Sequence, residues 1–416
     1  MIVKVPSNID IQKVVAPASK SYAQRAIFAA TLGNSSCVLR NLGSSDDVRH
    51  ILNISKQLGA DIQSSIEGVE IRPRVNNISR DLNCGESGLG IRLTTSIAST
   101  FGGKFSINGS GSLTSRPMNS FASFLPELGV SFESKNGFLP LTIEGSLEGG
   151  SVQIDCSDSS QFLSGLLMAL PLSQKDSEVS VTNLVSFKYV DMTLSVMKDF
   201  GIQFEAKENR LFSIRGNQKY EGPDHYQVEG DWSGAAFWIV YGAIHQDIEI
   251  QGLKEDSLQA DKAILDVLRL CGADFQWNKG VLRVQQSLLK PFEFDATNCP
   301  DLFPILATLA AAIEGESKIF GVHRLKNKES DRGLSLQKEF SKLGLQIDLE
   351  KDTMIIKGHK NLNSAVVHSN NDHRIAMACA IASCLTKEGI EIEEAESVNK
   401  SYPEFWSIIE NPEISE

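Results

Sequence analysis

Long apolar stretches and a secretion signal are both missing from this sequence. No apolar run reaches the roughly 20 residues of a membrane-spanning helix, the nearest being AAFWIVYGAI at 235–244. The segment MIVKVPSNIDIQK at the start also lacks the apolar core of a signal peptide. We therefore expect a cytoplasmic protein without a membrane partner.

An excess of basic residues and paired cysteines are missing as well. The chain has 40 Lys and Arg against 52 Asp and Glu, a net charge of −12, which argues against a broad nucleic-acid-binding face. Its seven cysteines form no CxxC pair and have no histidine at metal-binding spacing. We expect reduced thiols, no metal and no cofactor.

A repeated phrase organises the chain, whose 416 residues exceed one ordinary compact core and suggest two domains. An amphipathic helix that ends in glycine and is followed by an alternating strand occurs five times, and a sixth copy would end near residue 416. The glycines are 70 to 72 residues apart and are predicted to cap their helices in the left-handed conformation: Gly59, Gly129, Gly201, Gly272 and Gly344.

Each period also contains a polar turn before a helix of small and apolar residues. Such turns begin the segments CGESGLGIRL, CSDSSQFLSG, EGDWSGAAFW, NCPDLFPILA and NNDHRIAMAC, and a strand follows each helix. Each unit therefore reads strand, helix, strand, helix, strand, strand, which predicts an α/β protein of six repeated units. The period is too long for a helical solenoid.

The first of these helix starts, PASKSYAQRA at 17–26, combines hydroxyl and cationic side chains. Ser19 or Ser21 can cap the helix, and Lys20 and Arg25 add charge to its free N–H groups, so the segment is either an anion site or a capped surface helix. The six turns differ in their polar residues although the scaffold repeats. If the fold brings them together, one cleft receives Lys20, Arg25, Arg92, Gln161, Asp301 and Arg374.

The order and spacing of these motifs resemble a known family over essentially the whole length. The motifs are PASKSYAQRA, SSDDVRHIL (44–52), GESGLGIR (85–92), the SRP of Arg116, SSQFLSGLLMALPL (159–172), VEGDWS (228–233), KESDR (328–332), NDHRIAMA (371–378) and KSYPEFW (400–406). The chain is identified by them as a member of the 5-enolpyruvylshikimate-3-phosphate synthases, or 3-phosphoshikimate 1-carboxyvinyltransferases.

This resemblance implies two similar domains, each an inside-out α/β barrel of three units. The lower domain would comprise residues 1–13 and 228–416 and the upper domain residues 14–227, with crossings near 12–15 and 226–230. The active site would lie in the interdomain cleft.

The resemblance also implies the reaction. The enolpyruvyl group of phosphoenolpyruvate passes to the 5-hydroxyl of shikimate 3-phosphate, with release of phosphate, in the pathway to chorismate and the aromatic amino acids. The family is the target of glyphosate. We expect a monomer that binds these two small molecules.

Site residues follow from the resemblance position by position. The expected contacts of phosphoenolpyruvate are Lys20, Gly88, Arg116, Gln161, Arg332, Arg374 and Lys400. The expected contacts of shikimate 3-phosphate are Lys20, Ser21, Arg25, Ser159, Ser160, Gln161, Ser186, Asp301 and Lys328.

Three of the expected site residues have catalytic roles, and which of them moves each proton stays open. Asp301 fits the base at the hydroxyl, Glu329 fits the acid or base at the methylene carbon, and Lys20 completes the catalytic set. Neighbouring cations lower a carboxyl pKa and burial raises it, so the sequence leaves the balance at Glu329 undecided.

The sequence also departs from the family pattern and leaves rivals to weigh. Glu86 and Leu89 replace the usual Asn and Thr beside Gly88, and Arg324 replaces a ligand-contacting Asn, so glyphosate sensitivity and the role of Arg324 stay open. His50 and His373 fit structural roles at least as well as supporting roles at the site.

The rival functions have weaker support. An enolpyruvyl transferase for nucleotide sugars usually bears a reactive cysteine on the loop that here reads GGKFSINGSGSLTSRPM, and an RNA 3′-phosphate cyclase needs a nucleotidyl-accepting histidine. A non-catalytic repeat scaffold would not need a different polar signature at each turn.

Overall fold

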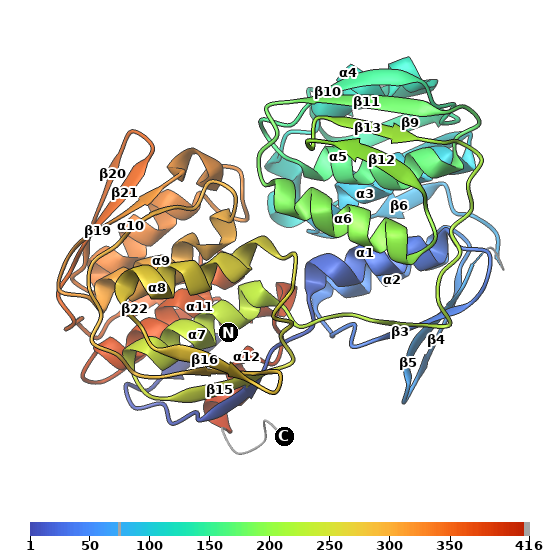
Figure 1. Ribbon diagram of the computed structural model, residues 1–416. Coiled ribbons are helices and arrows are strands. Elements are labelled where there is room, and N and C mark those ends of the chain that lie inside the picture. The colour runs from blue at the N-terminus through green and yellow to red at the C-terminus, as the bar shows by residue number, and fades with distance from the viewer. Residues whose placement is uncertain (74–75, 412–416) are drawn as a thin grey trace. The chain divides into compact units, whose positions relative to one another are not determined.

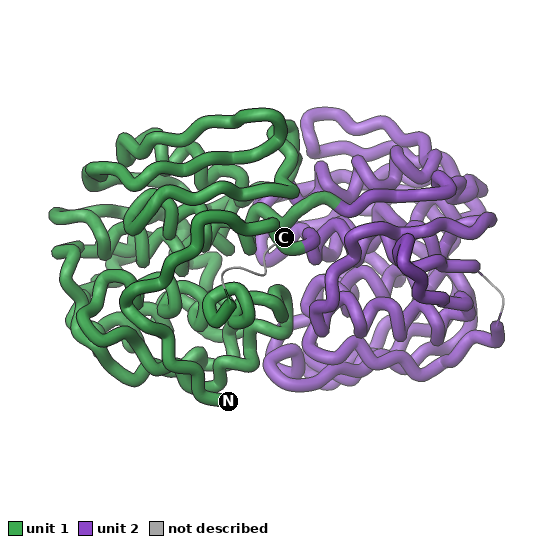
Figure 2. Tube along the Cα trace, turned by 90° about the horizontal axis from the view of Figure 1, so that it is seen from below, with its two compact units in different colours: residues 1–17, 229–416 green, residues 18–228 purple. Residues whose placement is uncertain are grey.

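The computed structural model describes residues 1–73 and 76–411 and divides into two compact units. Unit 1 contains residues 1–17 and 229–416, and unit 2 contains residues 18–228 (Figure 1, Figure 2). The end of the sixth copy, expected near residue 416, lies outside the described residues. Unit 2 begins at residue 18 because the preceding strand, β2 (Lys13–Val15), pairs in parallel with β15 of unit 1.

Unit 2 contains three four-stranded sheets, one for each repeat. In each sheet one pair of neighbouring strands is parallel, and two antiparallel pairings complete the sheet. The first sheet has the order β14 (His225–Gln227), β3 (Cys37–Arg40), β5 (Gly68–Arg72), β4 (Asp61–Ser65). The others are β6 (Asp81–Asn83), β7 (Lys104–Asn108), β9 (Phe138–Gly145), β8 (Val130–Lys135), and β10 (Ser151–Asp155), β11 (Ser177–Thr182), β13 (Leu211–Ile214), β12 (Phe204–Lys207).

The helices of unit 2 form its core, and its sheets lie outside them (Figure 1). Every residue of α3 (Gly88–Ala98) is buried, because its small and apolar side chains let neighbouring helices approach closely. The sheet strands instead alternate between buried and exposed residues, as in β10. The remaining helices are α1 (Lys20–Thr31), α2 (Asp46–Gln57), α4 (Ser120–Phe124), α5 (Gln161–Ala169) and α6 (Phe187–Asp199).

Unit 1 repeats this construction twice and varies it once. Its four-stranded sheets are β16 (Phe275–Asn278), β17 (Val281–Val284), β15 (Ile248–Gln251), β2, and β18 (Glu293–Asp295), β19 (Gly315–Phe320), β21 (Thr353–Gly358), β20 (Gln346–Glu350). The third sheet is β1 (Ile2–Val5), β23 (Ile390–Glu393), β22 (Val366–His368). The helices are α7 (Trp232–Ile244), α8 (Ile264–Cys271), α9 (Phe303–Ala311), α10 (Arg332–Lys342), α11 (His373–Ala382) and α12 (Phe405–Glu410), of which α7, α9 and α11 pack together.

Strands distant in sequence complete three of the six sheets. The first repeat takes its opening strand from β14, and the fourth takes its opening strand from β2. In the sixth repeat the amino-terminal strand β1 pairs antiparallel with β23. After β23 the described chain forms a 3-10 helix, η9 (Ala395–Lys400), and then α12, so this copy departs from the element order of the other five.

The five repeat glycines adopt the left-handed conformation that their sequence positions predict. Their φ angles are 96°, 87°, 80°, 79° and 81° in chain order. A side chain at these positions would be strained, which confirms that the glycines serve helix termination.

Two broad features of the described residues bear on the class of protein. None of their helices combines the length and the apolar character needed to cross a membrane. Residues 1–73 and 76–411 also contain no cluster of three or more His, Cys, Asp or Glu arranged to hold a metal ion.

Candidate active site

Asp301 is the centre of an ion-pair network in unit 1. It lies in the 3-10 helix η6 (Pro300–Leu302), directly before α9. One carboxylate oxygen, Oδ1, accepts hydrogen bonds from Arg332 Nη1 at 2.7 Å and Lys328 Nζ at 3.3 Å. The other, Oδ2, accepts from Arg374 Nη2 at 3.0 Å. The three cations fix the position of the Asp301 carboxylate, and its side chain is still 20% exposed to solvent.

Arg332 links Asp301 to two further carboxylates. It is the first residue of α10, its side chain is 1% exposed, and it donates to Glu329 Oε2 at 2.6 Å and to Asp372 Oδ2 at 2.8 Å. Asp372 caps α11 by accepting a hydrogen bond from the backbone N–H of Arg374. The starts of α10 and α11 and the helix η6 therefore bring Asp301, Lys328, Glu329, Arg332 and Arg374 together.

The charges of this network settle which form Asp301 adopts. Burial raises its pKa, but Arg374, Lys328 and Arg332 outweigh burial and hold the pKa well below its usual range. Burial lowers the pKa of Lys328, whereas the surrounding carboxylates raise the pKa of Arg332 and Arg374 in spite of burial. Asp301 is therefore an anion at neutral pH and can accept a hydrogen bond from a hydroxyl group.

Three further acidic residues of unit 1 surround this network and were not singled out from the sequence. Asp372 binds Arg332, Asp231 caps α7, and Asp261 is buried within electrostatic reach of Asp301 and Arg374. Asp231 and Asp372 stand at helix-capping positions of the motifs VEGDWS and NDHR, so a search for caps would have found them. No local pattern marks Asp261.

Lys400 is the remaining predicted site residue of unit 1. It is buried at the end of η9, which packs against α11.

In unit 2, Lys20 is the first residue of α1 and pairs with a buried carboxylate. Its Nζ lies 3.0 Å from Asp47 Oδ2 in the first turn of α2. Ser19 occupies the N-cap position of α1, but its side chain makes no capping hydrogen bond. Asp47 belongs to the motif SSDDVRHIL and had no predicted role, although the ion pair shows that it sets the position of Lys20 in this structure.

Gly88 begins α3 and lies against the guanidinium group of Arg116. A Cβ atom built at Gly88 would come 2.4 Å from Arg116 Nη1, so a side chain there must displace the arginine. Ser87 caps the helix by accepting from the backbone N–H of Gly90. Arg92, one turn later, donates to Gln161 Oε1 at 2.7 Å and so joins the starts of α3 and α5.

The predicted serine cluster of unit 2 lies at the starts of α5 and α6. Ser160 precedes α5 and donates from its hydroxyl to the carbonyl oxygen of Ser186, at the N-cap of α6, over 3.4 Å. Ser159 accepts a hydrogen bond from the backbone N–H of Gln161. Ser21, in the first turn of α1, is partly exposed.

Arg25 is fully buried and braces α1 against α6. Its guanidinium donates to Thr193 Oγ1 at 2.8 Å, to the carbonyl oxygen of Tyr189 at 3.0 Å and to that of Ser21 at 2.8 Å. Burial lowers its pKa to about 10, so Arg25 remains charged at neutral pH. In this structure Arg25 therefore supports the start of helix α1.

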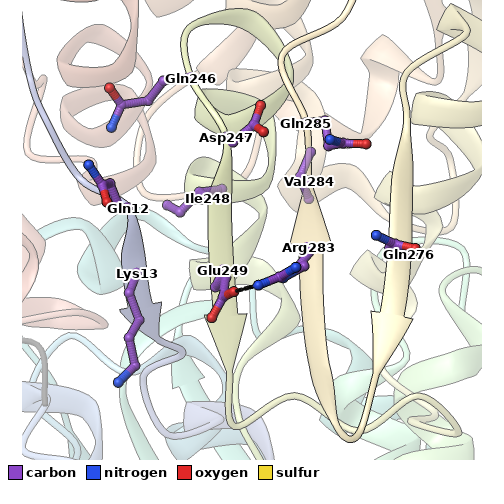
Figure 3. Close-up of a pocket in the computed structure, with 10 residues that line it drawn as sticks. All are labelled: Gln12, Lys13, Gln246, Asp247, Ile248, Glu249, Gln276, Arg283, Val284 and Gln285. Atoms are coloured by element: carbon purple, nitrogen blue, oxygen red, sulfur yellow. Dashed lines mark hydrogen bonds and ion pairs between the residues drawn. The ribbon is translucent and has the colours of Figure 1, made fainter.

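A surface hollow of unit 1 lies apart from all these residues. It has a volume of about 650 Å³ over the sheet β16-β17-β15-β2 and is lined by polar side chains such as Gln12, Gln276 and the ion pair of Glu249 with Arg283 (Figure 3). It contains none of the predicted site residues, and we assign it no role.

Comparisons with known proteins agree with the architecture. The EPSP synthase of Acinetobacter baumannii superposes with a TM-score of 0.83 at 24% identity, covering 98% of this chain and 97% of that one. An enolpyruvyl transferase of Streptomyces tendae gives 0.79 at 14% identity, covering 98% and 96%. The fold is thus that of the enolpyruvyl transferases.

Sequence comparisons identify the family. The family model for EPSP synthase (3-phosphoshikimate 1-carboxyvinyltransferase) matches residues 7–409. A 3-phosphoshikimate 1-carboxyvinyltransferase of Clostridium novyi is 36% identical over 419 residues, covering 98% of this chain and 96% of the relative. One from Clostridium perfringens is 38% identical over 412 residues, covering 97% and 96%. The chain belongs to the EPSP synthase family.

Proposed function

We propose that this protein transfers the enolpyruvyl group of phosphoenolpyruvate to the 5-hydroxyl of shikimate 3-phosphate and releases phosphate. The observation that carries the proposal is the carboxylate of Asp301, held as an anion by three cations beside Glu329. The two substrates bring two carboxylates and two phosphates, and fixed guanidinium and ammonium groups are the protein groups that bind such anions.

The chemistry requires two proton transfers, and the carboxylates of unit 1 can perform them. The methylene carbon of phosphoenolpyruvate gains a proton, and the 5-hydroxyl loses one as its oxygen bonds to the neighbouring carbon. We assign the hydroxyl to Asp301, which is ionised, and the methylene carbon to Glu329, with Lys20 completing the catalytic set. Loss of one proton from the resulting methyl group, together with release of phosphate from the adjacent carbon, then restores the double bond.

The proposed ligand contacts keep the sets expected from the sequence. The carboxylate and phosphate of phosphoenolpyruvate would be bound mainly by cationic side chains, with Gly88 and Gln161 beside them. This set is Lys20, Gly88, Arg116, Gln161, Arg332, Arg374 and Lys400. Shikimate 3-phosphate would be bound by serines at the starts of helices α5 and α6, by cationic side chains and by Asp301. This set is Lys20, Ser21, Arg25, Ser159, Ser160, Gln161, Ser186, Asp301 and Lys328. The cations now bound to Asp301 would turn in part to the substrate anions, which would make Asp301 a stronger base.

A phosphate-release assay tests the proposal. Phosphoenolpyruvate with shikimate 3-phosphate should release phosphate, whereas phosphoenolpyruvate with shikimate should not, because the 3-phosphate group supplies much of the binding. Release only with a nucleotide sugar would support the rival transferase. No release with any acceptor would support the scaffold reading.

We also propose that the protein is a cytoplasmic monomer and that its two units close on the ligands. Supporting this, the proposed contacts of each substrate come from both unit 1 and unit 2. Shikimate 3-phosphate should therefore reduce the radius of gyration measured by small-angle scattering. Shikimate is the matched control, and an unchanged radius with saturating shikimate 3-phosphate would contradict a site shared by the two units.

Gly88→Ala is expected to discriminate between substrate and inhibitor. The added methyl group displaces the guanidinium of Arg116, and glyphosate is longer than phosphoenolpyruvate, so the inhibition constant should rise by a larger factor than KM. Steady-state kinetics of the parent and the variant give both ratios.

Gly333→Ala is the matched control for that comparison, because a Cβ there meets its nearest neighbours at an ordinary 3.5 Å. If the parent is sensitive and both constants rise equally in Gly88→Ala, the steric explanation is wrong. If the parent enzyme already tolerates glyphosate, that tolerance would be attributed to Glu86 and Leu89.

A further inference from the structure

Asp261 is a buried acidic residue that the proposed chemistry does not yet use. It lies in the 3-10 helix η5 (Ala260–Ala263), before α8, and the residue is 1% exposed. A carboxyl group so deep in a protein needs compensating partners, because burial strongly disfavours its charged form. Among the described residues, its Oδ2 accepts a hydrogen bond from the Ser233 hydroxyl, and its Oδ1 has no hydrogen-bond donor.

The first turn of α7 holds Asp261 next to the proposed catalytic network. Ser233 donates its backbone N–H to Asp231 Oδ1 at 2.8 Å and its hydroxyl to Asp261, so one residue joins two carboxylates. Helix α7 packs against both η5, which carries Asp261, and η6, which carries Asp301. In unit 1 the helices α7, α9 and α11 contact one another (Figure 1), and Arg374 is the second residue of α11.

The loop before Asp261 is fastened at several points. Gln259 accepts from the backbone N–H of Trp232 at 3.1 Å and donates to Glu229 at 2.6 Å and to the carbonyl oxygen of Gly230 at 2.7 Å. These bonds tie the segment before η5 to the segment before α7. Asp261 is therefore held in place and cannot turn toward solvent.

We propose that Asp261 is a positioning residue whose carboxylate charge strengthens Asp301 as the base of the proposed reaction. The inference rests on the proposed function. In the proposed reaction Asp261 does not contact a substrate. It acts through two neighbouring residues, Asp301 and Arg374. A negative charge at Asp261 repels the negative charge of Asp301, and it attracts Arg374, which otherwise withdraws charge from Asp301.

The titration of Asp261 gives this effect a pH dependence. Burial first, and then the charges of Asp301 and Asp231, raise the pKa of Asp261 to about 7, while Arg374 and the Ser233 hydroxyl oppose that rise. The Cys299 thiol is a further titratable neighbour, and burial keeps it protonated. Asp261 is thus neutral below this pH and charged above it, so kcat should increase as the pH rises through about 7.

The test is the pH profile of kcat in the parent and in Asp261→Asn, which keeps the size and removes the charge. We expect the variant to lose the rise near pH 7 and to be roughly three- to tenfold slower than the parent above pH 8, with nearly equal rates at low pH. Both KM values should change by less than about twofold, because the side chain does not reach a substrate. Asp266→Asn is the matched control, since that side chain is 64% exposed on α8.

Ser233→Ala provides a second variant. Loss of the hydroxyl hydrogen bond raises the pKa of Asp261, so the rise in kcat should move to higher pH and remain present. This shift decides the matter even if Asp261→Asn fails to fold. A merely structural role would lower the rate without moving the profile.

Other outcomes overturn the inference. A rise near pH 7 that persists in Asp261→Asn would belong to another group, such as the substrate phosphate. A parent that turns over both substrates without any rise near pH 7 would overturn this inference and leave the proposed function intact. A parent enzyme that does not turn over the two substrates would contradict both the proposed function and the role of Asp261.

Discussion

Asp301→Ala is expected to lower kcat by at least ~10²-fold, the usual scale for loss of a positioned acid or base. The variant removes the only proposed acceptor for the 5-hydroxyl proton and leaves Lys328, Arg332 and Arg374 without their shared carboxylate. Glu329→Gln should cost a similar factor, because the amide cannot exchange a proton with the methylene carbon. Initial rates of phosphate release with saturating substrates measure both.

The affinity for shikimate 3-phosphate distinguishes the role of Asp301 from that of Glu329. Glu329→Gln should bind shikimate 3-phosphate with nearly the parental Kd by calorimetry, whereas Asp301→Ala should bind it more weakly because Asp301 is a proposed contact. Glu316→Gln and Asp266→Ala are matched surface controls and should turn over at the parental rate. The assignment of the proton transfers is wrong if Asp301→Ala and Glu329→Gln also turn over at that rate.

Arg332→Met is expected to lower the free energy of unfolding of unit 1 by about 3–5 kcal/mol, the cost of breaking a buried ion pair. Methionine approximates the length of the arginine stem but supplies no donors. Asp301, Glu329 and the fully buried Asp372 would then lose their common cation. This loss of stability should be measurable in the absence of substrate, so it is separate from any effect of the variant on catalysis.

Tryptophan fluorescence in a urea titration is a selective measurement of this effect. All four tryptophans lie in unit 1, at positions 232, 238, 277 and 406, so the signal reports the unit that contains Arg332. Arg269→Met is the control, since its ion pair with Asp266 is exposed and should be worth about 0–1 kcal/mol. Equal midpoint shifts in the two variants would show that the buried network does not stabilise the fold.

Local sequence patterns were sufficient for the repeat and for the starts of its helices. The spacing of glycines from Gly59 to Gly344 predicted five helix ends, and each has the left-handed conformation that a Cβ disfavours. The polar turns predicted that Lys20, Gly88 and Gln161 would stand at helix starts, and each is the first residue of its helix. The motifs also identified the family.

Strand pairing across the chain was beyond these patterns. Three-residue strands such as β2 and β14 carry too little periodicity to name their partners, and the structure places them in sheets with β15 and β3. Hydrogen bonding to β15 retains β2 in unit 1, so unit 2 begins at residue 18.

The sequence by itself therefore determined the spacing of the repeat, the glycines that end its helices and the residue types at each turn, because each unit shows these features within a few neighbouring residues. The ligand roles of those residues remain predictions. Only the tertiary structure decided that three cations converge on Asp301, that Arg25 is occupied between α1 and α6, and that Asp261 is buried with a raised pKa. Such properties depend on desolvation and on charges contributed by segments far apart in the chain, which local spacing does not specify.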